Sequence, residues 1–125
     1  MTSRLITGNT HTDVRGTLTY NNNFDVSQVK RIYFIENKDT QFIRAWQGHQ
    51  IEQRWFTAVN GSFFIKVIKI DDWNIPTPTL LQEEYILTSE NLKVLHLPAG
   101  YVSSIQALEE NSKLMLMADY GLGEI

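Results

Sequence analysis

The sequence predicts an all-β protein built as one domain. Short segments rich in Val, Ile, Phe, Tyr and Trp follow one another along the chain, and clusters of Gly, Asn, Asp and Pro separate them. No long stretch keeps the apolar period of a helix. Many short strands at nearly regular spacing are typical of a sandwich, a jelly roll or a closed barrel. A chain of 125 residues suits a single core, so we expect one domain over residues 1–125.

The expected strands, in chain order, are 17–20, 29–35, 42–46, 53–59, 62–70, 84–87, 93–97, 102–108 and 113–120. One helical turn is expected at 88–92, capped by Thr88 or Ser89. Asn60-Gly61 is a two-residue hairpin signal, because a type I′ turn needs positive φ at both central residues. Segments 63–68 and 114–117 are apolar on both faces, so we expect a second chain to cover an outer sheet face, as in a homodimer.

Composition excludes several classes of function. The net charge is −3, with 11 Lys+Arg against 14 Asp+Glu, which argues against binding to a nucleic-acid backbone. The absence of cysteine removes disulfides, thiol nucleophiles and thiolate metal sites. The longest apolar run, 114–118, is too short to span a bilayer, and 1–15 is polar with no signal-peptide character. We therefore expect a cytoplasmic protein with no nucleic-acid or membrane partner.

The densest polar cluster of the chain lies in residues 44–56. In an extended strand, alternate side chains share one face, and here they are Gln47, His49, Ile51, Gln53 and Trp55. A histidine and two amides among aromatics are typical of a polar floor in an apolar pocket for a small ligand. The alternative is a hydrogen-bonded core histidine, with the glutamines in solvent.

Four segments carry a resemblance to a known family. They are Asp13-Val-Arg-Gly-Thr-Leu18, then Val29-Lys-Arg-Ile-Tyr-Phe-Ile35, then Arg44 to Gln53 followed by Gly61-Ser-Phe63, and finally Pro98-Ala-Gly-Tyr101 with Ala118-Asp-Tyr120. In this order they resemble Asp-x-Arg-Gly-x-Leu, Lys-Arg-x-Tyr, Arg-Gly-x-His-x-His…Glu-Gln…Gly-Ser, and Pro-x-Gly with Ala-x-x-Tyr. These motifs belong to the WxcM-like cupins, which are nucleotide-sugar 3,4-ketoisomerases. The chain is more distantly similar to the dTDP-4-keto-6-deoxyhexose 3,5-epimerases.

The resemblance implies a cupin-type jelly roll, and a homodimer in which N-terminal strands are exchanged. It also implies a dTDP-linked 4-keto-6-deoxyhexose as substrate, in the synthesis of deoxysugars for surface polysaccharide. Moving the ketone from C4 to C3 needs a base at C3, and His49 fits that role. The family's His-x-His pair reads Gln47-Gly-His49 here, and the Gln47 amide could donate to the enediolate. Tyr33 is a candidate acid or oxyanion donor, or else a sheet aromatic with its hydroxyl in water.

A nucleotide diphosphate needs fixed cations, and Arg15 and Arg44 lie in the resembling motifs. Arg44 differs in parity from Gln47, so it reaches the same cavity only before the regular strand or at a bulge. Trp46 and Gln53 are further candidates for substrate contact. The remaining arginines, Arg31 and Arg54, fit a surface ion pair as well as they fit the site.

Many cupins bind a metal through two histidines, a glutamate and a later histidine. Only His49 and Glu52 remain from that set, and in an extended strand they point to opposite faces. Ser103 and Ser104 stand where the later histidine is often found. We expect no metal and no other cofactor. The changed motif also leaves open a second function, that of a non-catalytic sugar-nucleotide-binding cupin or an accessory partner of such an enzyme.

Overall fold

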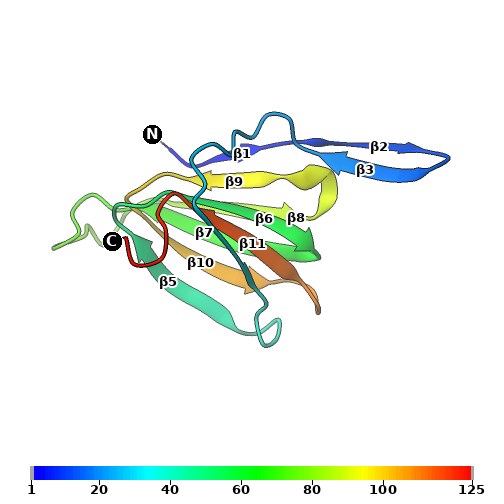
Figure 1. The fold of residues 1–125 in the computed structure, drawn as a ribbon. Helices are drawn as coiled ribbons and strands as arrows, with labels where there is room; N and C mark the ends of the chain where they lie inside the picture. Colours follow the sequence, from blue (N-terminus) through cyan, green and yellow to red (C-terminus); the bar gives the residue numbers. More distant parts are fainter. Residues whose placement is uncertain (1, 125) are drawn as a thin grey trace.

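Two antiparallel sheets face each other in the computed structural model, which describes residues 2–124 (Figure 1). The first sheet has the order β1 (Arg4–Ile6), β9 (Val94–Leu97), β6 (Arg54–Asn60), β11 (Lys113–Ala118) and β4 (Arg31–Ile35). The second has the order β5 (Ile43–His49), β10 (Tyr101–Ala107), β7 (Ser62–Lys69) and β8 (Gln82–Thr88). Strands that follow one another in the chain, such as β4 and β5 or β6 and β7, lie in different sheets. This arrangement confirms the predicted all-β jelly roll of cupin type.

The core lies between the sheets, where alternate apolar residues of each strand point inward. From the first sheet, β6 contributes Phe56 and Ala58, and from the second, β7 contributes Phe63, Ile65 and Val67, all at most 1% exposed. Side chains alternate along a strand, so their neighbours point away from this core. Burial of apolar surface here is the main force that holds the two sheets together.

The outer face of the first sheet carries a second apolar cluster. It contains Trp55 and Met117, and the segment between β3 and β4 packs Phe24 and Val29 against them. The apolar second face of β11 is therefore covered from within the same chain. The expectation that another chain covers 114–117 is wrong for this strand, because Phe24 and Val29, which precede β4, already pack on its outer face.

The Asn60-Gly61 pair is not a hairpin turn, so that prediction is wrong. β6 pairs with β9 and β11, whereas β7 pairs with β8 and β10, and residue 61 carries the chain from one sheet to the other. Gly61 has φ +73°, and a Cβ there would lie 2.1 Å from Ser112 Oγ, so this corner requires glycine. Local turn preference does not reveal which strands pair.

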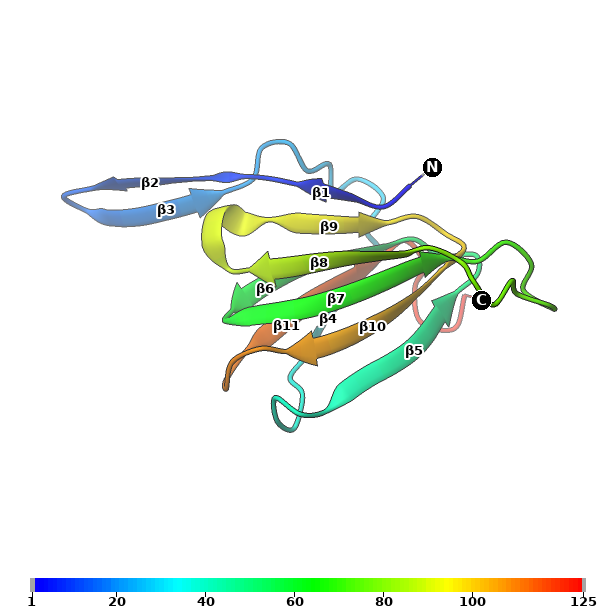
Figure 2. The same ribbon diagram turned by 180° about the vertical axis from the view of Figure 1, so that it is seen from behind.

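A ribbon of two strands, β2 (Asn9–Asp13) and β3 (Gly16–Tyr20), projects from the sandwich (Figures 1 and 2). Every residue of β2 is exposed, and in β3 only Tyr20 is partly buried. Val14 and Arg15 form the two-residue loop that joins these two strands. Sequence patterns missed β1 and β2, because neither has the apolar alternation of a half-buried strand.

The expected helical turn is a 3-10 turn, η1 (Glu90–Leu92). Ser89 holds the N-cap position, but no side-chain hydrogen bond caps the turn. None of the helices within residues 2–124 has the length and apolar character needed to cross a membrane.

Candidate active site

Polar side chains gather at one end of the sandwich, the end at which β5 finishes and β4 and β6 begin. These strands bring together a group that we call the His49 cluster, which consists of His49, Glu52, Arg54, Tyr33 and Arg31. The chain termini lie on this side of the sandwich, and the β2–β3 ribbon projects from the other side (Figure 1). β4 and β5 are edge strands of opposite sheets, so the cluster lies where the sandwich is open at its edge.

Gln47 and His49 share the inner face of β5, as the sequence predicted. Gln47 pairs with Ser103 and His49 pairs with Tyr101, and these residues of β10 have the same parity as Ile105 in the core. Directly paired residues of an antiparallel sheet point to the same face. Gln47 is nevertheless exposed, because β5 is an edge strand.

A β-bulge gives Arg44 the same inward direction. The register of β5 against β10 shifts between Ser103 and Ile105, so that Arg44 pairs with Ile105 while Gln47 pairs with Ser103. β5 thus has one more residue than β10 over this stretch, which reverses the parity of Arg44. Of the two arrangements that the sequence left open for this arginine, the bulge is the one present. Its Nε is buried and has no hydrogen-bond partner within the described chain.

Glu52 lies against His49, contrary to the expectation that the two point to opposite faces. The distance from His49 Nδ1 to Glu52 Oε1 is 3.4 Å, and their side chains are 11% and 9% exposed. β5 ends at His49 and the chain bends at 50–51, so the alternation of an extended strand no longer applies. A hollow of about 220 Å³ is lined by 48–52 and opens beside the imidazole.

Arg54 ties the cluster together from the first residue of β6. Its Nη2 forms an ion pair with Glu52 Oε1, and its Nη1 donates to the hydroxyl of Tyr33. Arg54 is only 6% exposed, so the expectation of a surface ion pair is wrong for this residue. Arg31 lies over the ring of Tyr33 at 5.1 Å, and Arg54 lies over the same ring at 5.5 Å.

Burial and the crowding of positive charge set the electrostatics of the cluster. Burial lowers the pKa of His49, and the positive charge of Arg31 lowers it further. Burial raises the pKa of Glu52, while Arg31 acts in the opposite direction. Burial lowers the pKa of Arg54 to about 10, and the like charge of Arg31 acts the same way. The neutral imidazole is therefore the favoured form of His49 near neutral pH.

Gln53 and Trp55 lie on the outer face of the first sheet, away from His49, so the expectation of a shared face is wrong for them. Trp55 stacks on His96, with ring centroids 5.4 Å apart. His96 Nε2 donates to Gln53 Oε1 over 2.8 Å, and the Gln53 amide donates to Asp119 over 3.0 Å. The bend at 50–51 explains this outcome, because it changes which parity faces inward.

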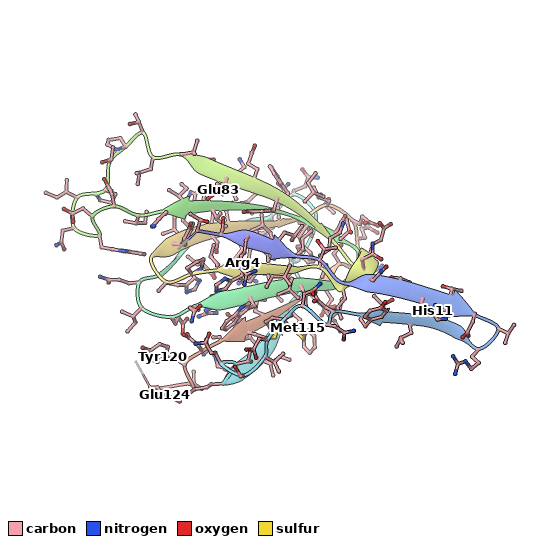
Figure 3. All side chains as sticks on the ribbon, turned by 90° about the horizontal axis from the view of Figure 1, so that it is seen from above. Arg4, His11, Glu83, Met115, Tyr120 and Glu124 are labelled. Carbon is pink, nitrogen blue, oxygen red and sulfur yellow. The ribbon has the colours of Figure 1, made fainter. Side chains whose placement is uncertain are left out.

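Trp46 and Arg15 also lie outside the His49 cluster. Trp46 is 47% exposed on the outer face of the second sheet, where it lines a separate hollow of about 250 Å³ with Pro76 and Val102. Arg15 lies at the tip of the ribbon, where its guanidinium contacts Asp13 at 2.7 Å and its side chain is 85% exposed. Figure 3 shows the ribbon, with His11 labelled, pointing away from Tyr120 and Glu124.

Within the described part of the chain, no group of three or more His, Cys, Asp or Glu could hold a metal ion. His49 and Glu52 are adjacent, but Gln47 and Ser103 occupy the neighbouring inward positions, and amide and hydroxyl groups are weak ligands for transition metals. The donor set of the His49 cluster therefore does not fit a transition metal.

Sequence reasoning did not assign Glu52 or Ser103 to this region, and it left Arg31 and Arg54 open between the site and a surface ion pair. One signal was available, since Arg54 precedes Phe56 and Ala58 with the same parity, and a charged residue on an apolar face is unusual. Glu52 had no such signal, because its position depends on the bend before it. Ser103 is 1% exposed with an Oγ that has no partner within residues 2–124, and only the register of β10 places it opposite Gln47.

Comparison with known proteins identifies one protein family and several solved structures of similar fold. The family model described as "FdtA: WxcM-like, C-terminal" matches residues 1–123. No curated protein matches the sequence. A 3,4-ketoisomerase from Helicobacter canadensis is similar in structure, with TM-score 0.75 and 18% identity over 99% of this chain and 87% of that one.

Two further solved structures are similar in fold. One is the histidine-to-asparagine mutant of the 3,4-ketoisomerase QdtA from Thermoanaerobacterium thermosaccharolyticum, in complex with TDP-4-keto-6-deoxyglucose, with TM-score 0.74, 20% identity, and 98% of this chain and 83% of that chain covered. The other is the rmlC epimerase of Mycobacterium tuberculosis, with TM-score 0.78, 18% identity, and coverage of 97% of this chain and 64% of that one. At these identities the likeness concerns the fold.

Proposed function

The chain belongs to the WxcM-like, C-terminal (FdtA) family, and from this premise we propose that it isomerises a dTDP-linked 4-keto-6-deoxyhexose, moving the ketone from C4 to C3. The observation that carries the proposal is His49, an imidazole kept neutral by burial beside a carboxylate and a phenol–guanidinium pair at the open end of the sandwich. Solved structures of similar fold are named as 3,4-ketoisomerases, and one of them holds TDP-4-keto-6-deoxyglucose.

The chemistry assigned to each residue follows from the position of its atoms. A 4-keto group acidifies the proton on C3, and the neutral imidazole of His49 takes that proton. Negative charge then builds on the oxygen at C4, and Tyr33 and Arg54 of the facing sheet are the donors proposed to stabilise it. Gln47 lies next along the inner face of β5 and donates an amide N–H to the same enediolate or to a sugar hydroxyl.

Arg44 and Arg15 are the proposed partners of the diphosphate. Arg44 is half-buried on the inner face, with a buried Nε that has no partner in the described chain, as expected for a group that awaits an anion. Arg15 lies on the ribbon, which projects from the side of the sandwich opposite the His49 cluster. Arg15 therefore reaches a diphosphate only in the site of a second subunit. Leu18 and Val14 of the ribbon are 62% and 104% exposed, which supports a homodimer with exchanged N-terminal strands.

Product formation tests the reaction. The protein is incubated with dTDP-4-keto-6-deoxyglucose in deuterated water, and NMR follows C3, C4 and C5. An isomerase removes the C3 proton and forms the 3-keto sugar with hydrogen returned to C4, whereas exchange at C5 indicates a 3,5-epimerase. His49→Asn should lower the rate of 3-keto sugar formation by at least roughly 10²-fold, while the sugar nucleotide still binds. Turnover that persists in His49→Asn contradicts the assignment.

A mixed-subunit experiment tests the exchange of N-terminal strands. Arg15→Ala and His49→Asn subunits are each inactive under the proposal, but a hybrid dimer regains one complete site. Random mixing then restores about a quarter of wild-type activity, since about half of the dimers are hybrids. Failure to recover activity, or a monomer in sedimentation at micromolar concentration, contradicts the dimeric site.

One observation favours a second function, that of a non-catalytic binder of nucleotide sugars. Gln47 stands where the family has a histidine, and an amide cannot carry a proton. Binding of dTDP-sugar by both wild type and His49→Asn, with no 3-keto sugar formed and no proton exchanged by either, selects this function. In both cases the proposed compartment is the cytoplasm and the proposed pathway is the supply of deoxysugars for surface polysaccharide.

A further inference from the structure

The His49 cluster holds one imidazole. The chain has three histidines, and two of them lie away from the His49 cluster. His11 is on the projecting ribbon with a side chain that is 63% exposed, and His96 is stacked on Trp55 on the outer face of the first sheet. With Gln47 beside His49, no second imidazole shares the proton. Another group must therefore fix the tautomer of His49 and stabilise its protonated form.

Glu52 has the position and the support for that task. Its Oε1 lies 3.4 Å from His49 Nδ1, and both side chains are nearly buried. The same oxygen is held by Arg54, whose other Nη donates to the hydroxyl of Tyr33. The carboxylate is thus held by an arginine of β6, a strand of the sheet that faces β5. Contacts of this kind shorten when substrate closes an active site.

We propose that Glu52 is the positioning residue of His49, and that its carboxylate accepts the Nδ1–H of the imidazole so that Nε2 is the only base in the site. This inference rests on the proposed function. A carboxylate behind an imidazole selects the tautomer and stabilises the imidazolium that forms in the reaction, as a general rule of histidine bases. Glu52 thereby compensates for the histidine that Gln47 replaces.

One base then carries the whole isomerisation. His49 Nε2 takes the proton from C3, the C3–H electron pair forms the C3=C4 bond, and the C4 carbonyl pair moves to the oxygen at C4. The same proton returns from Nε2 to C4, the proton of the C3 hydroxyl passes to the oxygen at C4, and C3 becomes the carbonyl. Substrate and product have the same atoms, and Glu52 stays ionised throughout.

The alternative is that Glu52 only neutralises Arg54. In that case its loss would alter stability and leave the tautomer and titration of His49 unchanged. The charged and titratable groups around the imidazole are Arg31 and Tyr33 on β4, Arg54 on β6, Tyr101 on β10 and Asp119 after β11. Removing the Glu52 charge takes away the negative charge closest to the imidazole and leaves only Asp119 to oppose the two arginines, so the pKa of His49 should fall further.

The tautomer is measured first, on the wild-type protein, by long-range nitrogen–proton NMR of ¹⁵N-labelled imidazoles. His49 is assigned by comparison with His49→Asn. The expected form of His49 carries its proton on Nδ1 and none on Nε2. The opposite tautomer overturns the proposal whether or not the protein has isomerase activity.

Kinetics of Glu52→Gln and Glu52→Asp form the second test. Glu52→Gln should lower kcat by roughly 10²-fold with KM little changed, and should move the acidic limb of kcat/KM to lower pH. Glu52→Asp keeps the carboxylate, so it should retain more activity and a limb near that of wild type. Glu83→Gln, the same change on β8 and away from His49, serves as control.

The outcomes separate this proposal from the proposed function. The role of Glu52 is overturned if wild type turns over substrate and folded Glu52→Gln has the same kcat and the same acidic limb of kcat/KM. The proposed isomerase activity would then still stand. A substrate deuterated at C3 should yield product that retains deuterium at C4 in ordinary water, and complete loss of label overturns the one-base route. No turnover by wild type overturns the proposed function and the proposed reaction together.

Discussion

Ser103→Ala should make this protein more stable, although it removes a hydroxyl from the interior. Ser103 is 1% exposed, and its Oγ has no hydrogen-bond partner among residues 2–124. A buried hydroxyl without a partner costs about 1–3 kcal/mol of folding free energy. Alanine keeps the Cβ and removes only the oxygen, so the void that remains is small. We expect the free energy of unfolding to rise by about 1 kcal/mol.

Ser112→Ala is the matched control, because the same change there should have the opposite sign. Ser112 is 4% exposed, but its Oγ accepts from Ser62 N at 3.1 Å and donates to Glu109 O at 2.9 Å. Alanine would leave the buried Ser62 N–H without a partner, so we expect a loss of about 2 kcal/mol. For a chain of this size, about 1 kcal/mol corresponds to roughly 4 °C in Tm.

Thermal and urea unfolding of the two variants measure these shifts, with and without dTDP-sugar. The free Ser103→Ala protein should melt higher than wild type and Ser112→Ala lower. If the Ser103 hydroxyl contacts the ligand from its place opposite Gln47, the sugar nucleotide should raise the Tm of wild type more than that of Ser103→Ala. A loss of 1 kcal/mol or more in free Ser103→Ala would refute the reasoning, because the hydroxyl would then have a partner.

Three further outcomes are expected. Gln47→His restores the family's imidazole, and should raise the rate of isomerisation; a loss of turnover would give the amide a role of its own. Gly61→Ala places a Cβ 2.1 Å from Ser112 Oγ at φ +73°, and should lower the free energy of unfolding by about 2–4 kcal/mol. Gly123→Ala is the control, because φ there is +83° but the space is open, and it should lower the free energy of unfolding by about 1 kcal/mol. Equal losses in urea unfolding would contradict the contact with Ser112. Burial lowers the pKa of His96, so the folded state binds its proton less well than the unfolded state; stability should fall as pH drops below about 6.5, and His96→Asn should flatten that fall.

Local patterns predicted what depends on neighbouring residues alone. Residue composition predicted a strand at 53–59, and the structure has β6 there, over Arg54–Asn60. The parity of β5 set Gln47 beside His49, and of the two arrangements that the same parity left open for Arg44, the bulge is present. These inferences hold because the side-chain direction in an extended strand has a period of two.

Patterns failed wherever the chain stopped being extended. The bend at 50–51 brings Glu52 to His49 and sends Gln53 to the outer face, although an extended chain would do the reverse. No glycine or proline announces this bend. Two expectations rested on an unbroken strand: that His49 and Glu52 point to opposite faces, and that Gln53 shares a face with His49. The same loss of parity hid the positioning role that we propose for Glu52.

The sequence by itself determined the all-β class, the approximate positions of most strands, and the shared face of Gln47 and His49. Only the tertiary structure decided that residue 61 carries the chain between sheets, that Arg54 of one sheet holds Glu52 beside His49, and that Arg15 lies on a ribbon away from the His49 cluster. Strand direction is set by adjacent peptide units, whereas strand pairing is set by the burial of whole faces contributed by distant segments. A site assembled from β4, β5 and β6 therefore exists only after those faces have met.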